Sequence, residues 1–214
     1  LSAVINYLLS NRSLRRRVSP FMLYEMARKY DEWPGEEYEG SSARGAMKGW
    51  LAHGVCDRDH WPVTGMYQLT PELAKNAMKT PGGAYYRVDH RNIRDMHAAL
   101  LDTGILFATI MVHEGWNGPQ ITTSLTYFSN GNKITRDIKV IARTKKTKGG
   151  HAIAIVGYTK NGFIIQNSWG ESWGSGGFAL LPYEDYLMHA MDVWVAPLGV
   201  PTDDSVWNEV VESS

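Results

Sequence analysis

The fold is decided by two neighbouring stretches, GGHAIAIVGY at residues 149–158 and QNSWGESWG at residues 166–174. The first stretch joins two glycines to an apolar, β-branched run, which predicts a buried strand with His151 at its mouth. Histidine titrates near neutral pH and is the side chain used most often as a general base. Asn167 follows 16 residues later, where its side-chain oxygen could orient the imidazole ring. The indole of Trp169 could shield that hydrogen bond from water.

Local strand pairing does not by itself bring His151 and Asn167 together. Asn161-Gly162 is a hairpin signal between the two stretches. A flat hairpin with these two residues as its loop places Asn167 opposite Val156, well short of His151. The two side chains meet only if the strands coil or a bulge intervenes.

The chain changes its periodicity near the middle. Apolar residues at helical spacing begin at Leu1, and the helix-start signals that follow are Ser19-Pro20, Ser42, Thr70-Pro71 and Asp89. The last of these helices is predicted to end at Gly104. Strands are then predicted at 105–112, on both sides of Asn130-Gly131, and at 151–158, 163–169, 178–181 and 193–195. Helices followed by antiparallel strands predict a segregated α+β fold.

Composition excludes several classes of protein. The 214 residues suit one large domain or a domain with two lobes. Lys+Arg 22 balance Asp+Glu 22, which leaves no global field that would attract nucleic acid or an anionic membrane. A single Cys cannot form an intrachain disulfide, and no apolar run approaches the roughly 20 residues of a spanning helix. We expect no nucleic-acid or membrane partner and a cytoplasmic location, with secretion of the complete protein left open.

The two stretches resemble the His and Asn segments of papain-like cysteine peptidases, which occur in the same order at similar separation. Looser resemblance extends to the family's first helix, its Ser-Pro helix, its Gly-rich substrate loop with the next helix, and the start of its second lobe, at residues 1–9, 19–30, 40–54 and 89–112. The resemblance covers residues 1–198. It implies a two-lobed fold, with a helical lobe at 1–104, an antiparallel β-barrel lobe at 105–198 and the active-site cleft between them. Residues 199–214 are then a C-terminal extension or linker.

The resemblance also implies roles for particular residues. His151 would be the general base and acid, Asn167 would orient it, and Trp169 would support the site. The residues implied to contact substrate are Gly40, Ser41, Ser42, Gly150 and Ala152. The expected partner is a peptide or protein substrate, with no cofactor and no metal, and the oligomeric state stays open.

The sequence departs from the family at the nucleophile. The family's catalytic Cys begins the first helix, where the helix dipole stabilises a thiolate. Here the helical pattern is already running at Leu1, so we expect the thiol, and the family's oxyanion-hole Gln, to lie upstream. The 214-residue chain should then be inactive by itself. Cys56 follows a helix end, where the dipole raises a thiol pKa, and is expected to be a buried or partly buried small hydrophobe.

Other interpretations remain open at this point. A catalytically inactive papain-like module could bind a peptide or partner, and a thiol acyltransferase or amidase could use the same dyad. His53, Cys56 and His60 have a spacing that could suit zinc, although polar loop residues are the preferred interpretation. The basic segments 15–17 and 143–148 are interpreted as solvated loops in preference to a nucleic-acid patch. His97 is expected to be a satisfied core histidine, and a cleft-rim role for His113 and Glu114 stays open.

Overall fold

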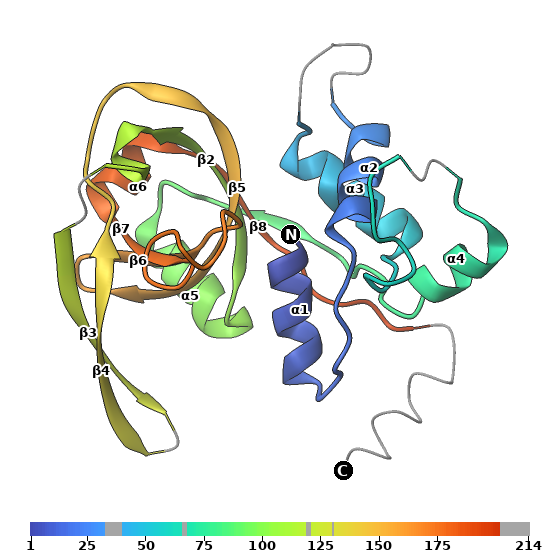
Figure 1. Cartoon of the computed structure of the whole chain (residues 1–214), viewed down its shortest axis with the longest axis horizontal. Helices are drawn as coiled ribbons and strands as arrows, with labels where there is room; N and C mark the ends of the chain where they lie inside the picture. Colours follow the sequence, from blue (N-terminus) through green and yellow to red (C-terminus); the bar gives the residue numbers. More distant parts are fainter. Residues whose placement is uncertain (33–39, 66–67, 119–120, 130, 202–214) are drawn as a thin grey trace. The chain divides into compact units, whose positions relative to one another are not determined.

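The computed structural model describes residues 1–32, 40–65, 68–118, 121–129 and 131–201 (Figure 1). Contacts divide the chain into two compact units. One contains Leu1–Arg87 and the chain from Trp194 onward, and the other is Val88–Val193. The expected extension at 199–214 lies outside the described residues from residue 202 onward.

Capping side chains set the starts of three helices in the first unit. The helices are α1 (Ser2–Asn11), α2 (Pro20–Lys29), α3 (Ala43–His53) and α4 (Pro71–Ala77). Ser19, Ser42 and Thr70 each accept a hydrogen bond from the backbone N–H three residues further on, as the sequence predicts. Helices α2 and α3 pack against each other, and Met22, Met47 and Trp50 are buried.

An eight-stranded sheet lies mostly in the second unit. Its strand order is β1-β8-β2-β5-β6-β7-β4-β3. The strands are β1 (Tyr86–Val88), β2 (Leu106–His113), β3 (Ile121–Ser129), β4 (Asn132–Val140), β5 (Thr147–Thr159), β6 (Gly162–Gln166), β7 (Phe178–Pro182) and β8 (Ala190–Val195). The unit also contains α5 (Ile93–Thr103), the 3-10 turn η1 (Glu114–Trp116) and α6 (Tyr183–His189). Most of the helices therefore precede most of the strands along the chain, as the α+β prediction requires.

The sheet is open, whereas the resemblance implied an antiparallel β-barrel. Within the described residues, β1 and β3 form the two edges and do not pair with each other. Strands β3 and β4 form a long hairpin that extends beyond the other strands (Figure 1). Strand β4 joins the sheet through one parallel pair, Val140 with Leu180, at its last residue. Among the described residues, β4 therefore pairs with the sheet only at its C-terminal end, and β3 pairs with β4 alone.

The two Asn-Gly signals have different outcomes. The hairpin at Asn130-Gly131 is confirmed, since Ser129 pairs with Asn132, although Asn130 itself lies outside the described residues. The predicted loop at Asn161-Gly162 is wrong by one residue, because Thr159 pairs with Gly162 and the turn is Lys160-Asn161. Gly162 is needed elsewhere. A Cβ there would lie 2.2 Å from the Leu181 backbone oxygen, so the glycine permits close pairing with β7.

Several element boundaries differ from the expectations. Helix α5 begins after Asn92, whose side chain accepts from two backbone N–H groups, and not at Asp89. It ends at Gly104 with φ 76°, as predicted. The contacts place α5 in the second unit, whereas the expected boundary after residue 104 placed it in the helical lobe. Helix α6 was not predicted. In the described part of the chain, no helix has the length and apolar character needed to cross a membrane.

Candidate active site

His151 lies on β5 at the end of a buried face. Strand side chains alternate, so His151 shares a face with Ile153 and Ile155, both of which are buried. His151 itself is half-buried and pairs with Ile110 of β2. The strand therefore holds the imidazole at the margin of the core, with access to solvent.

A bulge and a shifted turn bring Asn167 toward His151. Because the turn is Lys160-Asn161, the pairing register of β6 on β5 differs by two residues from that of the flat hairpin expected from the sequence. A register shift between Ile155 and Gly157 adds one more residue, and Ala154 pairs with Gln166. Asn167 follows directly, and its backbone N–H donates to the Gly177 oxygen at 2.9 Å.

The His151–Asn167 hydrogen bond identifies the tautomer of the imidazole. Nε2 of His151 lies 2.7 Å from Oδ1 of Asn167. The Ser168 backbone N–H donates to the same oxygen at 2.8 Å, which identifies that atom as an acceptor. Nε2 therefore carries the hydrogen, and in neutral His151 the lone pair lies on Nδ1. Nδ1 is the nitrogen that can accept a proton.

Three tryptophans form a cluster, and two of them contact His151. The ring of Trp169 lies 4.9 Å from that of His151, with 38% of the residue exposed. Trp116 is fully buried and meets His151 edge-to-face at 6.2 Å. Trp173 stacks on Trp116 at 5.8 Å, and its Nε1–H donates to the Trp116 backbone oxygen at 2.9 Å. The structure therefore places Trp169 beside His151, and adds Trp116 and Trp173, which the sequence analysis did not identify.

The surroundings of His151 favour its neutral form. Burial lowers the pKa of His151 below its usual value, and the hydrogen bond to Asn167 raises it in part. Asn167 is nearly completely buried, so its oxygen makes this bond with little competition from water. A neutral imidazole with a free Nδ1 lone pair is the state that a general base requires.

The residues expected to contact substrate divide between the two units. Gly150 and Ala152 are exposed and flank His151 on β5. Gly40, Ser41 and Ser42 belong to the first unit. The Ser42 side chain accepts from the Gly45 N–H as the cap of α3, and its backbone N–H donates to the Asp31 carboxylate at 3.1 Å.

Cys56 has the environment of a structural thiol. It is fully buried, and its thiol donates to the Leu73 backbone oxygen at 3.2 Å. Burial, with the neighbouring Asp57 charge, raises the pKa of Cys56 to about 12. The structure thus confirms the expected buried thiol and adds burial as the main cause of its high pKa.

Two other histidines bond tyrosine hydroxyls. His53 bonds the Tyr30 hydroxyl at 2.9 Å, and His97 bonds the Tyr183 hydroxyl at 2.8 Å. Among the described residues, one group of His, Cys, Asp and Glu side chains is close enough to share a metal ion, and it is His113, Asp185 and His189. In the described residues, His53, Cys56 and His60 therefore do not come close enough together to share a metal ion. Sequence reasoning missed Asp185 and His189 because no local pattern links them to His113.

Comparison with known proteins identifies the class that this fold and site define. A family model described as papain family cysteine protease matches residues 34–192. The chain therefore belongs to the papain family of cysteine proteases, as the resemblance predicted.

The relatives vary in how much of the chain they match. The uncharacterized peptidase C1-like protein L477 of Acanthamoeba polyphaga mimivirus is 26% identical over 175 residues, which are 75% of this chain and 52% of that protein. Cathepsin K of Mus musculus is 60% identical over 35 residues, 14% of this chain and 11% of cathepsin K. The chain thus spans about half the length of the mimivirus relative and a small part of cathepsin K.

Solved structures share the fold. Xylellain, a cysteine protease from Xylella fastidiosa, matches with a TM-score of 0.72 at 22% identity, over 93% of this chain and 77% of xylellain. Digestive procathepsin L 3 of Tenebrio molitor larval midgut matches with a TM-score of 0.61 at 16% identity, over 92% of this chain and 60% of that chain. These matches confirm the papain-like fold.

Proposed function

We propose that the protein is a cysteine peptidase in which His151 is the general base and acid and Asn167 orients it. The observation that carries the proposal is the shared oxygen of Asn167, which accepts from both His151 Nε2 and the Ser168 N–H. That arrangement leaves the lone pair of Nδ1 to take a proton from a thiol.

The nucleophile in this proposal is a cysteine outside residues 1–214. The chain contains one Cys, and Cys56 is buried with a pKa of about 12. A thiol in that state supplies almost no thiolate near neutral pH. A cysteine ahead of α1 would instead lie at a helix N-terminus, where the dipole favours the anion.

The proposed reaction has two steps. The thiolate attacks the peptide carbonyl carbon, a carbon–sulfur bond forms, and the carbon–nitrogen bond breaks as His151 gives its Nδ1 proton to the leaving amine. Water then attacks the thioester carbon while His151 takes a proton from the water, and the carbon–sulfur bond breaks. This releases the acid and restores the thiolate beside protonated His151. Trp169 limits access of water to the His151–Asn167 bond.

Substrate contacts are proposed for both units. Gly150 and Ala152 flank His151 and present an exposed, small-residue surface for an extended peptide. Gly40, Ser41 and Ser42 are proposed to hydrogen-bond the substrate backbone. The Ser42 N–H already donates to Asp31, whereas the Ser42 hydroxyl accepts from Gly45 and keeps its own hydrogen to donate. The substrate class is a peptide or protein.

The test uses the complete protein, with the residues that precede Leu1, and the 214-residue chain. A thiol-reactive peptide electrophile should label the complete protein, and His151→Ala should reduce the labelling rate by at least about 100-fold. His60→Ala is the matched control, because His60 is exposed and should leave the rate unchanged. The 214-residue chain should be neither labelled nor active.

Two results would contradict the proposal. Labelling that is undiminished in His151→Ala would remove His151 from its role. Peptide hydrolysis by the 214-residue chain carrying Cys56→Ala would show that no upstream thiol is needed.

If the complete protein binds peptides but has no Cys ahead of α1, the family fold serves binding and not catalysis. Profiling with acyl-amines would distinguish a thiol acyltransferase from a peptidase.

A further inference from the structure

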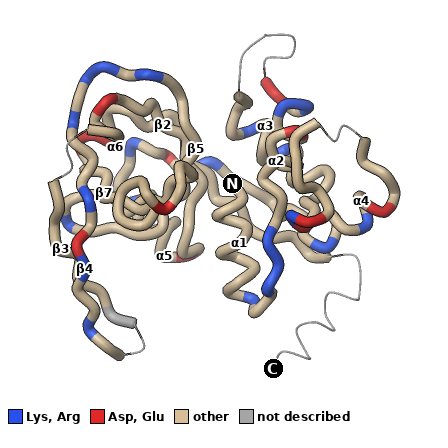
Figure 2. Tube along the Cα trace, in the orientation of Figure 1, with Lys and Arg blue, Asp and Glu red and all other residues tan. Residues whose placement is uncertain are grey.

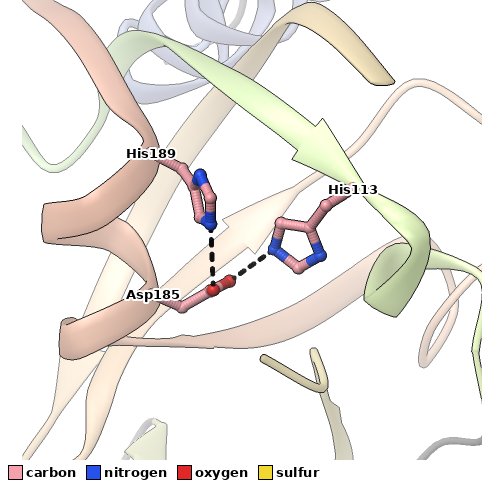
Figure 3. A group of neighbouring side chains, drawn as sticks. All are labelled: His113, Asp185 and His189. Carbon is pink, nitrogen blue, oxygen red and sulfur yellow. Dashed lines mark hydrogen bonds and ion pairs between the residues drawn. The ribbon is translucent and has the colours of Figure 1, made fainter. Parts of the chain in front are cut away.

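A buried cluster of two histidines and one aspartate lies in the second unit, apart from the His151–Asn167 pair (Figure 3). Nε2 of His113 lies 2.9 Å from Oδ2 of Asp185, and both side chains are completely buried. Nε2 of His189 lies 3.6 Å from the other carboxylate oxygen, Oδ1. Within the described residues, that second oxygen has no hydrogen-bond partner.

The backbone identifies where the protons of this cluster lie. The Gly115 N–H donates to Nδ1 of His113 at 3.2 Å, so Nδ1 holds the lone pair and Nε2–H donates to Asp185. Nε2 of His189 donates to the Thr144 backbone oxygen at 3.1 Å. Both Nε2 atoms therefore carry hydrogens in place of the lone pairs that a metal ion needs. The cluster is a hydrogen-bonded group.

The cluster connects three segments that are far apart in the sequence. His113 ends β2 and begins the turn η1, while Asp185 and His189 lie one helical turn apart on α6. Thr144 lies in the loop that leads into β5, the strand of His151. The turn also packs tightly on this loop, since a Cβ added to Gly115 would lie 1.7 Å from the Ala142 oxygen. The position of η1 is thus fixed relative to the entry of β5.

The turn η1 carries Trp116 into contact with the candidate active site. Trp116 is the last residue of η1, three positions after His113, and it is fully buried. Its ring meets His151 edge-to-face at 6.2 Å and Trp169 at 5.9 Å. A displacement of η1 would therefore move the ring that covers one side of His151.

We propose that Asp185 and His113 are positioning residues for His151. Asp185 holds the imidazole of His113, His113 holds the Gly115 N–H, and the turn so fixed places Trp116 against His151. The purpose of this arrangement, to keep the base dry and oriented, rests on the proposed peptidase function. The geometry of the arrangement does not depend on that function.

The first test measures the pKa of His151 by side-chain NMR in the 214-residue chain. The wild-type pKa should lie below the usual value because the ring is partly buried. Asp185→Ala should raise it toward about 6.5, the value of a solvated imidazole. Asp185→Asn keeps an oxygen that accepts from His113 and should leave the pKa near the wild-type value. Glu184→Gln is the matched control, because the neighbouring Glu184 is mostly exposed and pairs with Arg143.

A second variant and a second measurement cover poor folding of Asp185→Ala. His113→Phe keeps a ring of similar size and removes both hydrogen bonds, and it should raise the His151 pKa as well. Hydrogen exchange at the Gly115 amide should speed up in Asp185→Ala and stay slow in Asp185→Asn. Each folded variant is confirmed by circular dichroism before titration.

The outcomes separate this inference from the proposed function. A His151 pKa that stays unchanged in folded Asp185→Ala and His113→Phe would overturn the positioning role. Stoichiometric Zn²⁺ that shifts the His113 and His189 signals would also overturn it, because the cluster would then be a metal site. A complete protein without peptidase activity would contradict the proposed function and leave these NMR results intact.

Discussion

At the scale of single residues, one amide oxygen determines which nitrogen of His151 carries the hydrogen. Oδ1 of Asn167 accepts from His151 Nε2 and from the Ser168 N–H, so the amide cannot rotate without losing both bonds. Asn167 therefore fixes the tautomer of His151, because its amide oxygen is itself held by the Ser168 N–H.

We expect Asn167→Ala in the complete protein to lower kcat/KM by about 10- to 100-fold, part of the roughly 10²- to 10⁴-fold that a positioned base contributes. The imidazole would lose the acceptor that fixes its tautomer. Steady-state hydrolysis of a fluorogenic peptide checks this. Asn161→Ala, an exposed change in the β5–β6 turn, should have no effect, and an equal loss in both variants would contradict the role of Asn167.

Cys56 should be unreactive in the folded chain. With a pKa of about 12, only about one thiol in ten thousand is ionised at pH 8, and the group is also buried. Alkylation by iodoacetamide, followed by mass spectrometry, should therefore be slow in buffer and fast in urea. Rapid alkylation of the native chain would show that Cys56 is accessible.

The same pKa shift predicts a pH dependence of stability. The pKa of Cys56 rises from 9.0 in its usual state to about 12 in the fold, so the folded chain holds the proton more tightly. Its contribution to stability is present below pH 9 and is lost as the pH rises from 9 to 12. Urea unfolding at about pH 8 and about pH 10 should show a larger fall for the wild type than for Cys56→Ala. Equal falls would exclude this coupling.

At the scale of elements, the loop between β6 and β7 supports the site through its backbone conformation. The Asn167 N–H bonds Gly177, and the Gly177 N–H bonds Trp173. Gly174 has φ 61°, and a Cβ there would lie 2.3 Å from the Phe178 oxygen. Gly176 has a similar φ of 65°, but a Cβ added there would have no neighbouring atom within 4 Å. An added side chain at Gly176 would therefore meet backbone strain alone, whereas one at Gly174 would meet both backbone strain and a steric clash.

Gly176→Ala should lower the free energy of unfolding by about 1–2 kcal/mol, the cost of a left-handed conformation for a residue with a side chain. Gly174→Ala should lower it by a further 1–3 kcal/mol, roughly, because the methyl group also meets the Phe178 oxygen. Urea denaturation of both variants provides the comparison. Equal losses would mean that the loop relaxes around the added methyl group.

At the scale of the whole molecule, the formal charges sum to zero, and some of the basic residues gather on short segments of the chain. Figure 2 shows basic residues on the loop after α1 and on the segment that leads into β5. Arg15, Arg16 and Arg17 line a cavity of about 540 Å³ with Ser10, Ser13 and Leu14. No aromatic side chain is among these lining residues, so the cavity lacks the stacking surface that single-stranded nucleic acid uses.

We expect the 214-residue chain to elute from a heparin column at or below about 0.15 M salt, because a formal net charge of zero gives little counterion release. Retention to higher salt would contradict the predicted absence of a nucleic-acid partner. A variant with Arg15 and Arg17 changed to Ala would then show whether the loop after α1 is responsible.

Much of the architecture could be predicted because it depends on local chemistry. The caps Ser19, Ser42 and Thr70 satisfy backbone groups within their own helices, and the alternation around His151 follows from strand geometry. The papain-like family followed from residue types in two short stretches. These features need only neighbours in the sequence.

Tertiary structure decided the features that depend on distant partners. The turn between β5 and β6 lies one residue earlier than the sequence predicts, because Gly162 pairs closely with β7. The bulge after Ile155 brings Asn167 one residue closer to His151. His113 and Asp185 are 72 positions apart, so no local pattern could connect them. The sequence by itself determined which side chains stand at His151 and Asn167. Packing against other strands determined the distance between them, because strand register depends on contacts that neither strand contains.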